Sequence, residues 1–127
     1  MNWLLFASAL LGFGSAFGHA YLGERFVLRP LLKAPGENRV LNTATSRSLL
    51  RWVWHLPSFA WVQIGAVTVC LALAPAVWDE TSVKLLLYFG IGIYMTGAVF
   101  NAWAMRGPHV GNILLTLASL ALWFGAT

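Results

Sequence analysis

Four long apolar stretches, separated by three polar breaks, restrict this chain to very few folds. They predict helices over residues 3–21, 45–78, 83–103 and 110–124; the first three are near or above the roughly 20 residues that span a hydrocarbon core, and the last is rather short. Hydrophobic residues make up 59% of the 127 and charged residues only 9%. A soluble domain would carry more charge than this. Because the second and third connections are short, we expect an all-α fold, a four-helix transmembrane bundle with up-down-up-down topology.

The first connection, residues 22–43, is the one long loop that the sequence predicts. Pro30 and the pair Pro35-Gly36 interrupt any helix there, although Phe26, Val27 and Leu28 are too apolar for a free linker. We expect this segment to lie along the membrane interface or against the bundle. The whole chain, 1–127, then forms a single integral membrane domain. The apolar start lacks a preceding Lys or Arg, so it is interpreted as an uncleaved first helix.

The basic residues predict the orientation of the bundle. All but one of them lie on the side where helix one ends, helix two begins and helix three ends, which is one end of the bundle. They are Arg25, Arg29, Lys33, Arg39, Arg47, Arg51 and Arg106. Only Lys84 falls at the other end, beside Asp79 and Glu80. The positive-inside rule places the long loop in the cytoplasm and both termini on the opposite side. Topology therefore explains the net charge of +4, and nucleic acid is not an expected partner.

Each of the three histidines is expected near the cytoplasmic end of a helix. His19 lies near the end of the first helix, on a packing face with Ser8, Gly12 and Ser15, while His55 lies in the early part of the second and His109 opens the fourth. Pro57 should kink the second helix next to His55. Since ionisable groups are costly in a membrane, such a cluster indicates either a ligand site or a hydrogen-bonded structural cluster. Both interpretations stay open at this point.

Three chemistries fit such a site, with Glu24, Arg51 and Arg106 at a similar depth. Two of the histidines could ligate a haem b, with Arg51 and Arg106 on its propionates. Alternatively, His19, His55 and His109, with Glu24, could hold a transition metal ion. An anionic or quinone-like lipid could instead place its head at the basic mouth and its tail between helices. The first two would serve electron transfer or the handling of metal or haem.

Motifs typical of enzymes are absent from the sequence. It contains no H-E-x-x-H, G-x-S-x-G, Walker or C-x-x-C motif, and its single cysteine allows no internal disulfide. Whether the chain is an enzyme is therefore left open. A non-catalytic accessory subunit of a larger membrane complex, or a homo-oligomer surrounded by membrane lipid, fits the same apolar composition. The leading hypothesis remains a small protein that binds haem or metal.

Three patches of the sequence resemble those of small four-helix inner-membrane proteins of bacteria. They are His19-Ala20-Tyr21-Leu22-Gly23-Glu24-Arg25, the pattern Arg51-x-x-Trp54-His55-Leu56, and Arg106-Gly107-x-His109. The resemblance covers most of the chain in layout. It implies a multi-pass protein of the bacterial inner membrane and supplies no catalytic role for any residue.

Overall fold

The computed structural model of the protein describes residues 2–33 and 39–126, and these form an all-helical bundle without strands. Its main elements are α1 (Trp3–Gly23), which continues through a π-helical segment (Glu24–Leu28) into α2 (Arg29–Lys33), then α3 (Ala44–Leu73), α4 (Glu80–Ala104) and α5 (Val110–Ala126). Short 3-10 turns, Arg39–Asn42 and Pro75–Val77, precede and follow α3.

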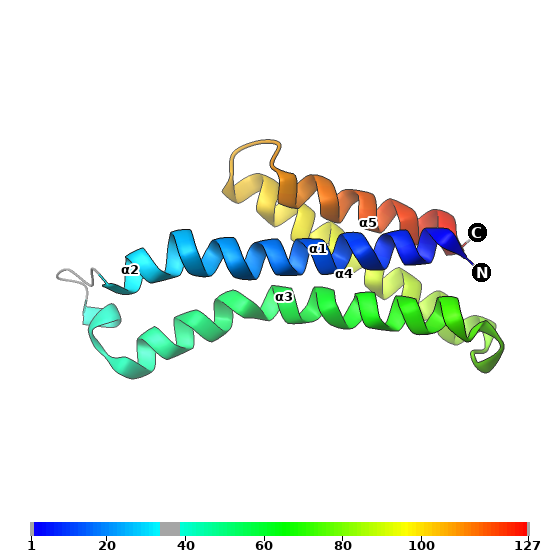
Figure 1. Cartoon of the computed structure of the whole chain (residues 1–127), viewed down its shortest axis with the longest axis horizontal. Coiled ribbons are helices and arrows are strands. Elements are labelled where there is room, and N and C mark those ends of the chain that lie inside the picture. Colours follow the sequence, from blue (N-terminus) through cyan, green and yellow to red (C-terminus); the bar gives the residue numbers. More distant parts are fainter. Residues whose placement is uncertain (1, 34–38, 127) are drawn as a thin grey trace.

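The helices run alternately up and down, and both termini lie at the same end of the bundle (Figure 1). Helix α1 packs between α3 and α5, while α4 packs on α5 and crosses obliquely behind α1. Within the described residues, three continuous helices are long and apolar enough to cross a membrane: Trp3–Lys33, Ala44–Leu73 and Glu80–Ala104. Helix α5 is apolar but shorter, with 17 residues. The chain is thus a helical membrane bundle, as its sequence predicts.

The first helix is longer than predicted. We expected a loop from residue 22, but Trp3–Lys33 is continuous and passes Pro30 without a break. The π-helical turn explains this, because the backbone N–H of Arg29 bonds to the carbonyl of Glu24, five residues back. That wider turn shifts the backbone just before Pro30, whose ring would otherwise crowd the carbonyl of Phe26. Of the expected loop 22–43, the Pro35-Gly36 break lies outside the described residues.

The other helix boundaries differ from prediction by fewer residues. Helix α3 ends at Leu73 and not near Trp78, because Pro75 follows and disfavours helix in the residues before it. Pro57 lies inside α3, as expected, and the helix bends in its first half (Figure 1). Asp79 caps α4 through a hydrogen bond from the backbone N–H of Ser82, so this helix starts at Glu80.

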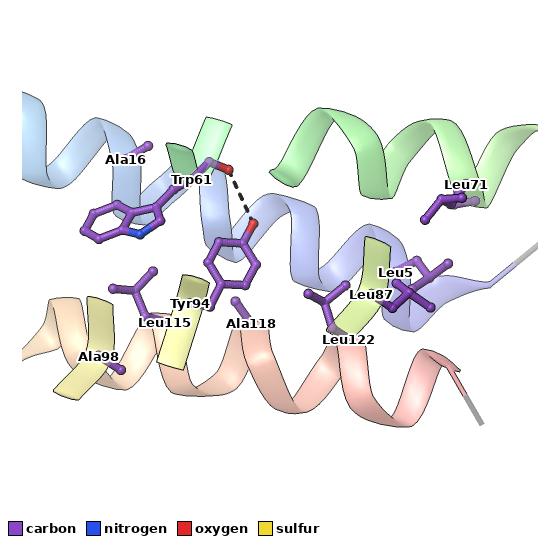
Figure 2. Close-up of a cluster of buried hydrophobic side chains, with 11 residues drawn as sticks. Leu5, Ala16, Trp61, Leu71, Leu87, Tyr94, Ala98, Leu115, Ala118 and Leu122 are labelled. Atoms are coloured by element: carbon purple, nitrogen blue, oxygen red, sulfur yellow. Dashed lines mark hydrogen bonds between the residues drawn. The ribbon is translucent and has the colours of Figure 1, made fainter. Parts of the chain in front are cut away.

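The four long helices, α1, α3, α4 and α5, meet around Tyr94 of α4, which is completely buried. Its hydroxyl donates a hydrogen bond to the carbonyl oxygen of Trp61 on α3, 3.4 Å away, and Leu115 and Ala118 of α5 lie beside it (Figure 2). A side chain on Gly12 of α1 would overlap this hydroxyl. The small-residue face predicted for α1 therefore allows close packing, with Ser8, Gly12 and Ser15 all buried.

Candidate functional site

The charged site of this bundle lies where α1 gives way to the π-helical segment. Glu24 is the first residue of that segment, and its side chain turns toward α3. One carboxylate oxygen, Oε1, lies 3.1 Å from Nη2 of Arg51 and 3.5 Å from Nε of Arg29. The other, Oε2, lies 3.6 Å from Nε2 of His55. Glu24 therefore joins α1, α2 and α3 at one point.

The side chains of Glu24 and its neighbours are partly buried. Its side chain is 23% exposed and that of His55 is 20% exposed, whereas Arg51 is 48% exposed. Oε2 is fully covered yet accepts no hydrogen bond from any described residue. A buried acceptor without a donor costs free energy, so this carboxylate is a feature that packing alone does not account for.

His19 lies beside this cluster in an aromatic enclosure. Its ring stacks on Trp54 at 5.1 Å and meets the edge of Trp61 at 5.3 Å, between ring centroids. Its Nδ1 is 3.0 Å from the hydroxyl of Ser58. Trp54 in turn lies directly on Gly23, where any side chain on the glycine would overlap the indole. Trp54 therefore packs within the contact between α1 and α3.

A groove of about 450 Å³ opens beside the charged cluster. Its apolar part is lined by Phe17, Ala20 and Tyr21, and its polar part by Glu24, Arg25, Arg29 and His55. Phe17 and Tyr21 stack in parallel with 5.8 Å between centroids, and Nη1 of Arg25 donates to the Tyr21 hydroxyl at 2.9 Å. The groove thus has an apolar part followed by a charged part along the first helix, an arrangement that suits a ligand with an apolar tail and a charged head.

His109 and Arg106 take part in a different, local arrangement in the turn between α4 and α5. The backbone N–H of His109 donates to Oδ1 of Asn112, and its Nδ1 accepts from the backbone N–H of Gly111. Both His109 and Arg106 are exposed. The contacts of His109 therefore cap α5, in contrast to those of His55, which reach across to α1.

The described residues contain no group of three or more His, Cys, Asp or Glu side chains placed to hold a metal ion. The structure thus brings Glu24, Arg51 and His55 together, with His19 adjacent, and does not gather His19, His55 and His109 into a three-ligand site. Haem or metal binding by these residues stays a prediction.

Sequence reasoning missed part of the groove. Phe17, Tyr21 and Glu24 are spaced i, i+4 and i+7, which places them on one helical face, and this spacing could have revealed them. The sequence predicts a loop at Arg29, because the first helix is expected to end at residue 21. It therefore does not predict that Arg29 lies beside Glu24 on a continuous helix. Gly23 and Trp54 carry no sequence signal of their contact, since it depends on how α1 and α3 pack.

Comparisons of the chain with models of known protein families, with curated proteins and with solved structures find no match. The resemblance to small bacterial inner-membrane proteins therefore stays a prediction.

Proposed function

We propose that this chain binds an anionic membrane lipid, with the phosphate of its head at the arginines around Glu24 and its tail along the groove. The observation that carries this proposal is the order of groups along the groove. Phe17, Ala20 and Tyr21 provide an apolar track, and Arg25 and Arg29 follow it directly. A phospholipid presents the same order of tail and anionic head.

The charges at the head of the groove favour an anion. Arg25 and Arg29 line the groove beside Glu24, and Arg51 pairs with the same carboxylate from α3, so positive charge is in excess. Guanidinium groups bind phosphate oxygens with two parallel hydrogen bonds and are favoured where phosphate is recognised. The side chain of Arg29 is 63% exposed and that of Arg51 48%, so both guanidinium groups are accessible to a ligand from outside the bundle.

We further propose that this charged end faces the cytoplasm of a bacterial inner membrane, where anionic lipids attract basic segments. Alkaline phosphatase fused to the C-terminus should then be active in cells, because this enzyme folds only outside the cytoplasm. An inactive alkaline phosphatase fusion, together with fluorescence from a green fluorescent protein fused at the same position, would show that the C-terminus lies in the cytoplasm and would contradict this orientation.

Lipid binding can be tested by calorimetric titration of the full chain in a neutral detergent. Short-chain phosphatidylglycerol should bind, whereas phosphatidylcholine, whose choline cation opposes the arginines, should bind at least tenfold more weakly. Inorganic phosphate alone should bind more weakly still, because it lacks the tail that the groove accepts. Equal affinity for all three ligands would overturn the proposal.

Substitutions at the two ends of the bundle locate the binding site. The double variant Arg29→Gln/Arg51→Gln should lose phosphatidylglycerol binding, and Arg29→Gln alone, which leaves the pair of Glu24 with Arg51 intact, should weaken it. Lys84→Gln is the matched control, because Lys84 is also basic and exposed but pairs with Glu80 at the far end. Helix content measured by circular dichroism verifies folding. Binding that survives the double variant would refute this site.

The haem and metal hypothesis is tested on the same purified sample. An absorption spectrum, oxidised and then reduced with dithionite, together with elemental analysis, reports either group. A haem band lost in His19→Ala or His55→Ala would favour that hypothesis over lipid binding. A larger protein that co-purifies in mild detergent would instead favour the role of accessory subunit.

A further inference from the structure

The two oxygens of the Glu24 carboxylate have different surroundings. Oε1 meets both arginines, Arg29 and Arg51, whereas Oε2 is buried and lies 3.6 Å from Nε2 of His55. An ionised carboxylate can only accept hydrogen bonds, so its approach to an imidazole nitrogen is favourable when that nitrogen carries a proton. The Glu24–His55 contact thus places an imidazole nitrogen beside a buried carboxylate oxygen, between α1 and α3.

Ionisable groups from every packed element surround this pair. They are His19 on α1, Arg25 in the π-helical segment, Arg29 on α2 and Arg51 on α3. Arginine keeps its charge at all physiological pH values, so it cannot respond to pH. Imidazole is the side chain that ordinarily changes charge between pH 5 and 8. The ring of His19 is engaged with Ser58, Trp54 and Trp61, which leaves His55 as the imidazole facing the carboxylate.

A bound anion changes the charge balance at this point. To reach Arg29 and Arg51, a phosphate must lie close to the carboxylate that these arginines now neutralise. Two like charges at such a distance repel each other, and repulsion between anions favours the gain of a proton nearby. The imidazole of His55 lies beside the carboxylate and lines the same groove, so it can supply the compensating positive charge.

Building on the proposed function, we infer that binding of an anionic lipid head at Glu24, Arg29 and Arg51 takes up a proton from solvent at the Glu24–His55 pair. The lipid head and the proton then bind cooperatively, so binding of either one raises the affinity of the site for the other. The affinity for the lipid should rise about tenfold as the pH falls from 8 to 5.5, within the range of typical coupling between two sites. The site would act as a lipid receptor that tightens in acid.

Calorimetry in paired buffers measures this coupling directly. The full chain is titrated with short-chain phosphatidylglycerol at pH 7 in two buffers that differ in ionisation enthalpy. The difference in observed heat then gives the number of protons exchanged. The phosphodiester of this lipid keeps a single negative charge between pH 5.5 and 8. Any proton that is taken up on binding must therefore be bound by the protein. We expect uptake of a substantial fraction of one proton per bound lipid.

Two variants assign the proton. In His55→Gln, binding should fall to the level that the unaltered chain shows at pH 8, and it should no longer depend on pH or buffer. Glu24→Gln should also abolish uptake, because the repelling charge is gone. His109→Gln is the control, since this exposed histidine caps α5 and should leave uptake unchanged.

Each outcome separates this inference from the proposed function. Lipid binding without proton exchange would overturn the coupling and leave the lipid site standing. Uptake that persists in His55→Gln would place the proton elsewhere and refute the role of the Glu24–His55 pair. Absence of lipid binding in every buffer would refute the proposed function itself, and the coupling with it.

Discussion

The two ends of the bundle use the same types of charged residue in different ways. At the start of α4, contacts are local: Asp79 bonds to Ser82 three residues on, and Glu80 pairs with Lys84 four residues on. At the other end, Glu24 pairs with Arg51 and His55, which lie on a different helix. Local contacts fix the beginning of a helix, whereas the contacts of Glu24 depend on the packing of α1 against α3. Only the second kind can assemble a site from separate elements.

Burial makes this difference energetic as well. The side chains of Glu80 and Lys84 are 81% and 56% exposed, and such surface pairs contribute little to stability because water screens them. Glu24 is only 23% exposed. Removing a partner from a partly covered charge is more costly, since water replaces the partner poorly. Substitutions should therefore have larger effects around Glu24 than around Glu80.

The largest effect is expected at the charged end, where Trp54 of α3 packs directly on Gly23 of α1. Gly23→Ala would force its new methyl group against the indole of Trp54 and should destabilise the bundle by about 2 kcal/mol, as in overpacked cores. The groove should be disturbed with it. Titration with sodium dodecyl sulfate, followed by helical circular dichroism, measures the free energy of unfolding.

Gly14→Ala is the matched control for that change. Gly14 lies on the same helix, but nothing lies within 4 Å of where its side chain would begin. This variant should be neutral or stabilising by up to about 1 kcal/mol, because alanine restricts the unfolded chain. Equal stability of the two variants would show that the Trp54 contact does not restrict α1.

An intermediate effect is expected from neutralising the carboxylate at each end in turn. Glu24→Gln keeps the size of the side chain but removes the charge that holds Arg29 and Arg51. Because the carboxylate is mostly covered while Arg29 is 63% and Arg51 48% exposed, the loss should be about 1 kcal/mol. Glu80→Gln should be indistinguishable from the unaltered chain in the same titration. The same loss from both variants would remove the distinction between the two ends.

The sequence was sufficient to predict the bundle because hydrophobic length and the spacing of polar breaks decide membrane topology. The caps that begin α3 and α4 are likewise local, because Thr43 and Asp79 accept hydrogen bonds from the backbone N–H groups of Ser46 and Ser82. The exception is Pro30, which predicted a break where a π-helical turn keeps the helix continuous. Backbone adjustments of that kind depend on the surrounding packing and leave no clear pattern in the residues.

The candidate site was predicted only in part. Glu24, Arg51 and His55 were expected near one another from their depth, and the structure brings them into contact. Depth alone does not give the direction of a side chain around the bundle, however. His109 shares the predicted end but caps α5. The partners of a charged residue across helices follow from rotation and tilt, which a hydropathy pattern does not specify.

A smaller effect than that of Glu24→Gln should come from the local cap at Asp79, and it should carry its own pH dependence. Hydrogen bonds from the hydroxyl and backbone N–H of Ser82 lower the pKa of the Asp79 carboxyl below its ordinary value. Folding therefore favours the ionised form. The resulting stabilisation is complete above the unfolded value of about 3.9 and disappears as the pH falls through the lower, folded value.

Asp79→Ala should accordingly lower the melting temperature slightly at pH 7, and the difference from the unaltered chain should shrink on acidification below pH 4. Asp79→Asn separates the cap from the charge, because asparagine accepts the same hydrogen bond but does not titrate. It should keep most of the stability at pH 7 and lack the acid-dependent loss. Neither variant should alter lipid binding, since a cap bonded to residues of its own turn has no contact through which to move Glu24 at the opposite end. A change in lipid affinity from either would mean that the two ends are coupled through the helices, and that the local character of the Asp79 turn does not isolate it.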